Sequence, residues 1–237
     1  MTEQEVFNLY RKLNLKHNDI CVSCIAGCAN NGIRLSNPAS IWQVGTNYHK
    51  AKIRLLFVGK IARRGNNLGK LVSNNFIDAT EKANELYYDE SWAYWSYTKA
   101  IASRIFKDNP WENIAFTNCI KCDDSSTQDN SNAIQKENCL KNLGVLWKEI
   151  EILKPHNIVF YTHWDFDYYI EEFRPLKNFT DKTDKNFTVN IGQKTMPWWE
   201  RTYYNENDTV KILRVGHPER KKKVDFVDKI TNWINNE

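Results

Sequence analysis

The chain combines two patterns of hydrophobic positions, one with the spacing of helices and one made of short continuous apolar runs. In the first segment Val6, Leu9 and Leu13 recur on one helical face, and Thr2 and Glu5 have the spacing of a capping box. The same spacing predicts three further helices, over residues 91–106, 140–153 and 224–234.

Continuous apolar runs predict strands that are buried on both faces. The runs occur in the order "IRLLFVG", "ENIAFTN", "NIVFY" and "VKILRVG", with a weaker strand at "FTVNI". Residues 123–132 and 178–186 are polar enough to predict loops. Strands that alternate with helices predict one α/β domain over residues 1–237, a three-layer αβα sandwich with a central, mostly parallel four-stranded sheet. The site of such a sheet lies at the carboxyl ends of its strands.

Composition adds an excess of aromatic residues to this picture. Nine Trp, eleven Tyr and eleven Phe are present, several in polar settings where their rings could stack on bases. We therefore interpret "MPWWERTYY" as a possible lid or DNA-contact surface. The net charge of +4 permits DNA binding without requiring it. No apolar run reaches the roughly 20 residues of a membrane span, which predicts a cytoplasmic protein with no membrane partner.

Cytosolic thiols stay reduced, so the six cysteines are expected to be ligands or buried thiols rather than disulfides. Cys21 and Cys24 form a C-x-x-C motif, and sixteen residues separate Cys122 from Cys139. Four thiolates suit either Zn²⁺ or an iron–sulfur cluster, and spacing alone does not distinguish them.

Five motifs occur together in one order between residues 21 and 218. They are the C-x-x-C, a strand ending in "FVG", a strand ending in "TN" and running into "KC", a cysteine that opens a long helix, and a late strand ending in "HP". In this combination the chain resembles the uracil-DNA glycosylase superfamily, most closely the family 4-like branch that carries a [4Fe–4S] cluster.

The resemblance implies a structural [4Fe–4S] cluster, for which structural zinc is the alternative. Cys28 could compete with Cys24 as a ligand, and Cys119 is expected to be a small buried apolar residue. The ligands that the resemblance implies are Cys21, Cys24, Cys122 and Cys139.

The resemblance also implies two site residues. Asn118, in "TN", matches the Asn that reads the base, because its amide can both donate to a carbonyl and accept from a ring N–H. His217, in "HP", matches the His that hydrogen-bonds the departing base, where negative charge develops as the sugar becomes oxocarbenium-like. The structural alternatives are an Asn that caps a turn and a surface His before a helix.

The loop after the first strand departs from the family, because "GKIARRG" places Lys60 where the branch has an acidic residue. Lys60 could contact a phosphate or a polar group on a modified base, or it could form a Schiff base if Arg63 and Arg64 lower its pKa. It could also mark the loss of catalysis.

Basic residues are expected to hold phosphates, because the segment after "HP" has no apolar wedge before Val224. Phe76 is the expected stacking partner of the base, with Trp92 and Trp95 as alternatives that could equally be core. The expected phosphate-binding residues are Arg63, Arg64, Arg220, Lys221 and Lys222.

These features predict a monomeric DNA glycosylase that flips out and excises a modified pyrimidine from single- or double-stranded DNA. Hypermodified bases in foreign phage DNA are one such substrate. The alternatives are a nucleic-acid-binding protein that keeps the fold and cluster without catalysis, and a zinc-stapled α/β protein of unrelated activity.

Overall fold

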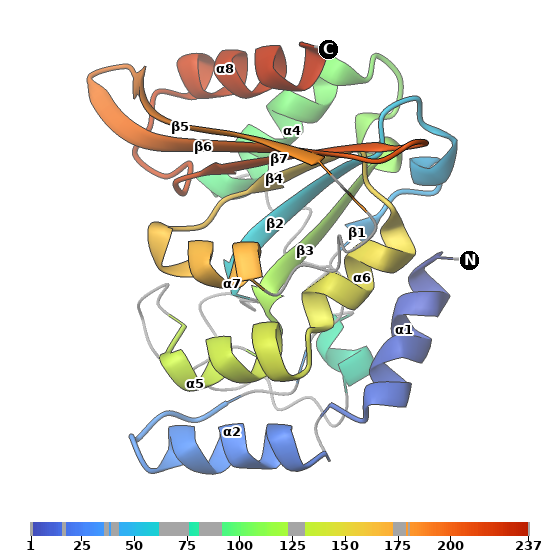
Figure 1. Ribbon diagram of the computed structural model, residues 1–237, viewed down its shortest axis with the longest axis vertical. Coiled ribbons are helices and arrows are strands. Elements are labelled where there is room, and N and C mark those ends of the chain that lie inside the picture. Colours follow the sequence, from blue (N-terminus) through green and yellow to red (C-terminus); the bar gives the residue numbers. More distant parts are fainter. Residues whose placement is uncertain are drawn as a thin grey trace.

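A seven-stranded mixed sheet forms the centre of the computed structural model, with helices on both faces (Figure 1). The strands lie in the order β1-β3-β2-β4-β7-β6-β5. Their bounds are β1 Gln43–Val44, β2 Leu55–Ile61, β3 Ile114–Ile120, β4 Asn157–Phe160, β5 Asp181–Ile191, β6 Lys194–Tyr204 and β7 Thr209–Val215. The structure describes residues 2–15, 18–35, 38, 43–61, 76–80, 92–122, 131–172, 179 and 181–236.

The sequence predicted a four-stranded sheet, whereas the sheet in the structure has seven strands. The adjacent strands β3, β2, β4 and β7 are parallel, as predicted, but β1 adds antiparallel at one edge and β6 and β5 add antiparallel at the other. Residues 181–186, expected to be loop, belong to the edge strand β5. An edge strand needs no continuous apolar run, because its backbone pairs on one side only and its polar side chains face water.

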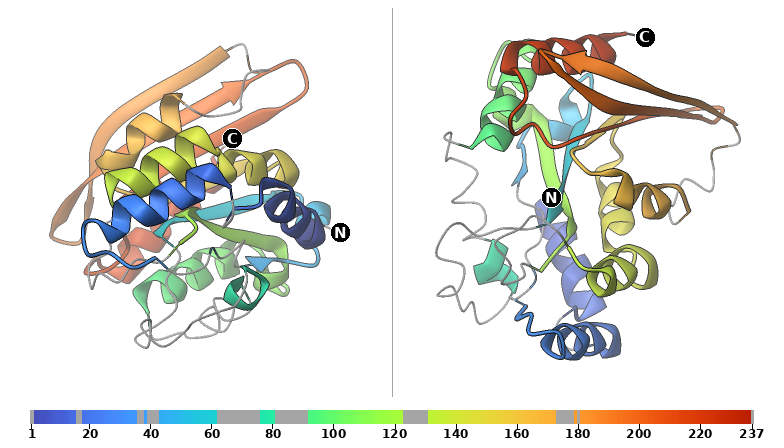
Figure 2. Two further views of the ribbon diagram at one scale, coloured as in Figure 1. Left: turned by 90° about the horizontal axis from the view of Figure 1, so that it is seen from below. Right: turned by 90° about the vertical axis from the view of Figure 1, so that its left-hand side faces the viewer.

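Two helical layers cover the sheet (Figure 2). One face carries α4 and α8, and the other carries α1 and α6, each pair packing together. No helix in the described ranges is long and apolar enough to cross a membrane. The helices are α1 Thr2–Leu13, α2 Asp19–Ala29, α4 Ala93–Ile105, α5 Ala133–Lys136, η4 Glu137–Asn142, α6 Val145–Leu153, α7 Asp167–Glu172 and α8 Lys223–Asn235, with 3₁₀ turns η1 Tyr48–Lys50, η3 Pro110–Asn113 and η5 Trp164–Phe166.

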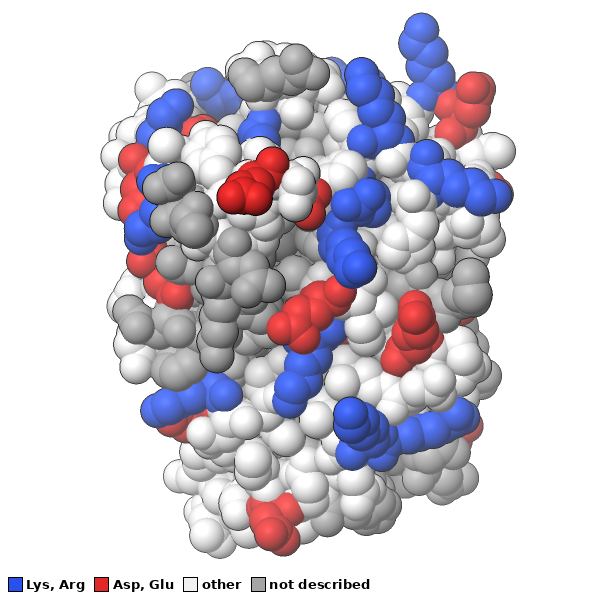
Figure 3. All heavy atoms as spheres, turned by 45° about the vertical axis from the view of Figure 1, so that its right-hand side comes forward, with Lys and Arg blue, Asp and Glu red and all other residues white. Residues whose placement is uncertain are grey.

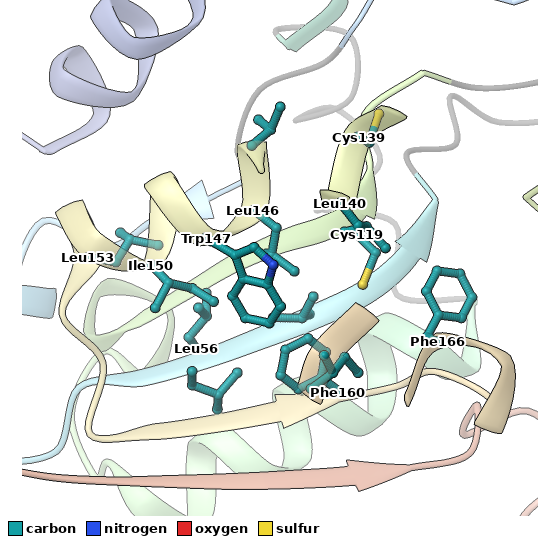
Figure 4. Packing of buried hydrophobic residues seen from close by; sticks show 14 of the residues in the cluster. Leu56, Cys119, Cys139, Leu140, Leu146, Trp147, Ile150, Leu153, Phe160 and Phe166 are labelled. Atoms are coloured by element: carbon teal, nitrogen blue, oxygen red, sulfur yellow. The ribbon is translucent and has the colours of Figure 1, made fainter. Parts of the chain in front are cut away.

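The apolar runs that predicted the strands form two cores, one on each face of the sheet. On the α6 face, Leu56 and Phe160 of the strands pack with Leu146, Trp147 and Ile150 of the helix (Figure 4). Full burial of each such side chain stabilises the fold by about 1.5–3 kcal/mol. The central strands are therefore held rigidly, and so are the residues at their ends.

Two helical features differ from the sequence prediction. The Cys-rich segment forms the helix α2, whose N-cap Asn18 accepts a hydrogen bond from the Cys21 amide at 2.8 Å. The single helix expected over 140–153 is instead a π-helix, η4, followed by α6. Gly144 separates them at φ +59°, a conformation that favours glycine and ends the first segment. π-helical turns are rare and often mark functional positions.

Candidate functional site

The carboxyl edge, where β2, β3, β4 and β7 end, brings several predicted site residues together. Gly59 of β2 is in register with Asn118 of β3. Gly216 and His217 follow directly after β7, the outermost of these four parallel strands. Residues from distant parts of the sequence thus meet at one edge because the strands are parallel.

Asn118 is only 2% exposed, and its amide lies over Gly59. A Cβ placed on Gly59 would come within 2.2 Å of Asn118 Oδ1, so position 59 requires glycine for this close approach. Within the described residues, the buried Nδ2 of Asn118 has no hydrogen-bond partner. A buried donor without a partner costs about 1–3 kcal/mol, so a ligand that accepts a hydrogen bond from Nδ2 would be favoured there.

Tyr94, at the start of α4, joins Asn118 and His217 into one group. Its hydroxyl lies 1.7 Å from the position that a Gly59 Cβ would take. Its ring stacks on the His217 imidazole, with centroids 5.3 Å apart and planes inclined by 20°. Sequence analysis missed Tyr94, because "SWAYWSY" contains several aromatic residues and gives no signal of which one faces the strand ends.

The tautomer of His217 follows from its backbone contact. Its Nδ1 accepts a hydrogen bond from the Glu219 amide at 3.2 Å. In neutral imidazole one nitrogen accepts and the other carries the proton, so this contact places the proton on Nε2. In its neutral form, His217 therefore carries its hydrogen-bond donor at Nε2.

A buried ionic network supports β3 from the other face of the sheet. The ammonium of Lys121 lies 2.5 Å from a Glu149 oxygen and donates to the Asn118 carbonyl at 2.6 Å. Thr117 also accepts from Lys121 and donates to Glu149, and the Tyr10 hydroxyl donates to Glu149. This network fixes the backbone of the residue whose amide lies at the site. Sequence analysis missed it, because Lys121 and Glu149 are far apart in the chain and look like surface residues.

The predicted metal ligands lie on facing elements. α2 carries Cys21, Cys24 and Cys28 at helical spacing and packs against α5 and η4, the π-helix with Cys139. The thiol of Cys139 interacts electrostatically with those of Cys21 and Cys24. Cys122 lies two residues after the end of β3. The backbone amide of the residue before it, Lys121, donates a hydrogen bond to the Cys139 sulfur.

These thiols are buried enough to be protonated in the metal-free chain. Burial, followed by the neighbouring thiols, raises the pKa of Cys21 to about 12, and burial likewise raises that of Cys24 to about 12. Four soft sulfur donors fit the chemistry of an iron–sulfur cluster or Zn²⁺. However, no group of three or more His, Cys, Asp or Glu within the described ranges is arranged to hold a metal ion. The donor types fit, and the metal site itself remains a proposal.

The two cysteines that are not proposed ligands, Cys119 and Cys28, are both buried. Cys119 is completely buried among apolar side chains, as predicted, whereas Cys139 lies at the periphery of the same core (Figure 4). Burial raises the pKa of the Cys119 thiol. Cys28 is also fully buried and accepts a hydrogen bond from Asn132 Nδ2 at 3.3 Å.

Lys60 is at the carboxyl edge, but strand alternation directs its side chain to the opposite face from Gly59. The charge of Lys60 acts on His163, which lies just after β4. Burial, followed by Lys60, lowers the pKa of His163, with further contributions from Arg214 and Lys221. Lys60, Arg214 and Lys221 therefore all lie within electrostatic range of His163, and Asp165 opposes them.

The basic segment after "HP" turns back onto α4. Tyr97 donates a hydrogen bond to the Lys221 carbonyl at 2.7 Å, and burial lowers the pKa of Lys221. Arg220, with 80% of its side chain exposed, has φ +61°, and Lys222 caps α8. On the face shown in Figure 3, basic and acidic side chains are interspersed rather than gathered into one large patch. Any phosphate contacts there are consequently local.

The predicted stacking residues are separated from Asn118. Phe76 packs against the rings of Phe7 and Tyr10 on the α1 face of the sheet, with the Tyr10 centroid at 5.5 Å. Trp95 is completely buried in the core, and Trp92 packs at the border of the same core. The aromatic ring that the structure places beside Asn118 is that of Tyr94.

Two further predictions concern other segments. "MPWWERTYY" is not a lid but the inner hairpin strand β6, whose Trp198 and Trp199 are each only 4% exposed. Arg63 and Arg64 lie outside the described residues.

The fold and site define an α/β protein with a polar group of Asn, Tyr and His at the carboxyl edge of its sheet. No protein-family model matches the chain, and no curated protein matches it. The resemblance to the uracil-DNA glycosylase superfamily rests on the sequence motifs alone.

Proposed function

We propose that the chain is a DNA glycosylase that excises a modified pyrimidine base. The observation that carries this proposal is the buried Asn118 amide, whose Nδ2 has no partner among the described residues and which lies near Tyr94, whose ring stacks on His217. A pyrimidine edge offers what this amide needs, a carbonyl for Nδ2 and an N–H or amino group for Oδ1. The sequence resemblance assigns the same roles to Asn118 and His217.

In this mechanism, the nucleotide flips out of the stack and its base lies between the Asn118 amide and His217. The N-glycosidic bond breaks with its electron pair passing to the base. The Nε2 proton of His217 hydrogen-bonds the negative charge that develops there, which lowers the barrier. Water adds to the sugar carbon and loses a proton, leaving an abasic site and the free base.

The proposed cluster has a structural part in this account. Cys21, Cys24, Cys122 and Cys139 would hold it, and it would join α2 and η4 to the end of β3. Base release by hydrolysis transfers no electrons, so no step passes through the cluster.

Lys60 is best interpreted as a phosphate contact. Its side chain leaves β2 on the face opposite to Gly59, away from the Asn118 amide. A Schiff-base role makes a different prediction, namely that borohydride would trap DNA on wild-type protein and not on Lys60→Ala.

A second function, nucleic-acid binding without catalysis, is favoured by one feature. Lys60 occupies the position of the family's acidic residue, so the group that would support the attacking water is missing there. Both functions predict DNA binding, and only the glycosylase predicts abasic sites.

The test is abasic-site formation on a panel of DNAs containing uracil, other deaminated or alkylated bases, and hydroxymethylated or glycosylated cytosine. We expect abasic sites on one member with wild-type protein and their loss with His217→Ala. Salt-dependent binding without abasic sites on any member would support the non-catalytic alternative, and absence of both would contradict DNA as the partner.

A further inference from the structure

The most exposed large apolar side chain in the described part of the chain is Trp164, at 72%. It follows His163 directly after β4, which lies between β2 and β7. Trp164 thus lies at the carboxyl edge, in the turn after β4, between the ends of β2, which carries Gly59, and β7, which His217 follows. An exposed indole offers a large ring face on which a partner can stack.

The turn that carries Trp164 is rigid. The Phe166 amide donates to the His163 carbonyl at 3.0 Å, and the Phe166 ring is 1% exposed in the core. Asp165 forms an ion pair with Lys136. The residues on either side of Trp164 are anchored. A partner that binds the indole would therefore cost little conformational entropy of the backbone.

A second exposed aromatic side chain follows Trp164 in the sequence. Tyr168, 57% exposed, is four positions beyond Trp164 in the continuous helical stretch formed by η5 and α7. Residues four apart on a helix share one side. Arg214 donates two hydrogen bonds to Asp167, within this stretch, and so anchors it to β7. Trp164 and Tyr168 together form an exposed aromatic pair.

Charged groups of both signs surround the pair: Asp165 pairs with Lys136 and Asp167 with Arg214, and further cations lie near His163. Burial and then the charge of Lys60 lower the pKa of His163, the neighbour of Trp164. Arg214 and Lys221 act in the same direction and Asp165 opposes them, and Arg214 is itself ion-paired with Asp167. Aromatic rings beside cationic groups are the combination that binds single-stranded nucleic acid, in which bases stack and phosphates are neutralised.

We propose that the exposed aromatic pair stacks on the bases next to the flipped nucleotide, with Lys60 and Lys221 holding the adjoining phosphates. The proposed partner is an unpaired DNA strand that crosses the carboxyl edge. This inference deepens the glycosylase proposal and rests on it for the identity of the partner. It also supplies the apolar contact with DNA that the basic segment after "HP" lacks.

The test is the affinity of the full chain for fluorescein-labelled oligothymidine, measured by fluorescence anisotropy. Stacking on one aromatic side chain contributes about 1–3 kcal/mol per base, so Trp164→Ala should weaken binding about 5- to 150-fold. Tyr168→Ala should act in the same direction, and Trp164→Phe should keep most of the affinity. The matched control is Tyr204→Ala, since Tyr204 is 37% exposed but pairs with Thr209 at the opposite end of β7.

The outcomes separate this inference from the function on which it rests. Weakened binding by Trp164→Ala and Tyr168→Ala, with Tyr204→Ala unchanged, supports the aromatic pair as the stacking surface. Wild-type affinity in both variants, while wild-type protein still forms abasic sites, overturns the inference and leaves the glycosylase proposal intact. Failure of wild-type protein to bind either single strands or duplex overturns both.

Discussion

The ammonium group of Lys121 lies 2.5 Å from a carboxylate oxygen of Glu149, and the two side chains are only 1% and 0% exposed. The same ammonium holds the Asn118 carbonyl at 2.6 Å, and the Lys121 amide donates to the Cys139 sulfur. One residue therefore connects the amide at the proposed site to the helix that carries a proposed metal ligand. Lys121 thus joins the proposed base-reading residue to the element that carries Cys139.

Breaking this pair should be far more damaging than breaking an exposed one. Glu149→Leu leaves the Lys121 charge buried without its counterion, which should cost about 3–5 kcal/mol in the free energy of unfolding. The exposed pair Lys141–Glu137 provides the control, and Glu137→Gln should cost less than about 1 kcal/mol. Urea denaturation measures both, and losses of similar size would contradict the importance of the buried network.

Gly59 should be intolerant of any side chain. A Cβ there would come within 1.7 Å of the Tyr94 hydroxyl and 2.2 Å of Asn118 Oδ1, so Gly59→Ala must displace one of them at about 1–3 kcal/mol. We expect lower thermal stability and loss of base release. Gly216→Ala is the control, because its Cβ would meet only Met196 at 3.5 Å, an ordinary contact. Equal activity in the two variants would show that the approach of Asn118 to β2 is unimportant.

Metal binding should release protons. Burial first, and then the neighbouring thiols, raises the pKa of Cys21 to about 12, so this thiol is protonated at neutral pH and must lose its proton to become a ligand. Affinity for Zn²⁺ or iron should therefore fall as the pH falls. Calorimetry in buffers of different ionisation enthalpy should detect about one proton per thiolate ligand.

Two variants identify the ligand set in that experiment. Cys139→Ser should abolish tight metal binding, whereas Cys28→Ser should keep it. Loss in both would place Cys28 among the ligands, and tight binding in Cys139→Ser would refute the proposed site.

DNA affinity should rise as the pH falls. The folded-state pKa of His163 is lowered by burial and then by Lys60, so His163 is neutral at pH 7. A phosphate bound beside it favours the charged form and raises this pKa, so binding takes up a proton and strengthens as the pH falls below neutral. His163→Gln should lose this dependence and His49→Gln should keep it. Anisotropy titrations at several pH values would show a flat wild-type profile if the prediction is wrong.

The central part of the fold could be predicted from the sequence, because buried parallel strands are continuous apolar runs. The ends of those runs also identified Asn118, and His217 just beyond β7, as neighbours at one edge. The β5–β6 hairpin could not be predicted in the same way, since its polar edge strand resembles a loop. Helix α2 was not predicted, because its Cys and Gly residues are poor indicators of a helix, although Asn18 is a good N-cap.

The parts of the site that sequence missed depend on long-range pairing. Nothing local indicates that Lys121 would be buried against Glu149, or that Tyr94 rather than Trp95 would face Asn118. Similarly, the exposure of Trp164 depends on how β4 ends relative to its neighbours. Such features are set by the packing of whole elements, which the local pattern does not encode.

The most direct test of the central claim is release of free base from the DNA panel, detected by mass spectrometry, with wild-type protein and Asn118→Ala. We predict that wild-type protein releases one modified pyrimidine and that Asn118→Ala releases it at least about tenfold more slowly, the loss expected for a hydrogen-bonded base edge. Equal release by both proteins, or no base released from any DNA by wild-type protein, would contradict the account.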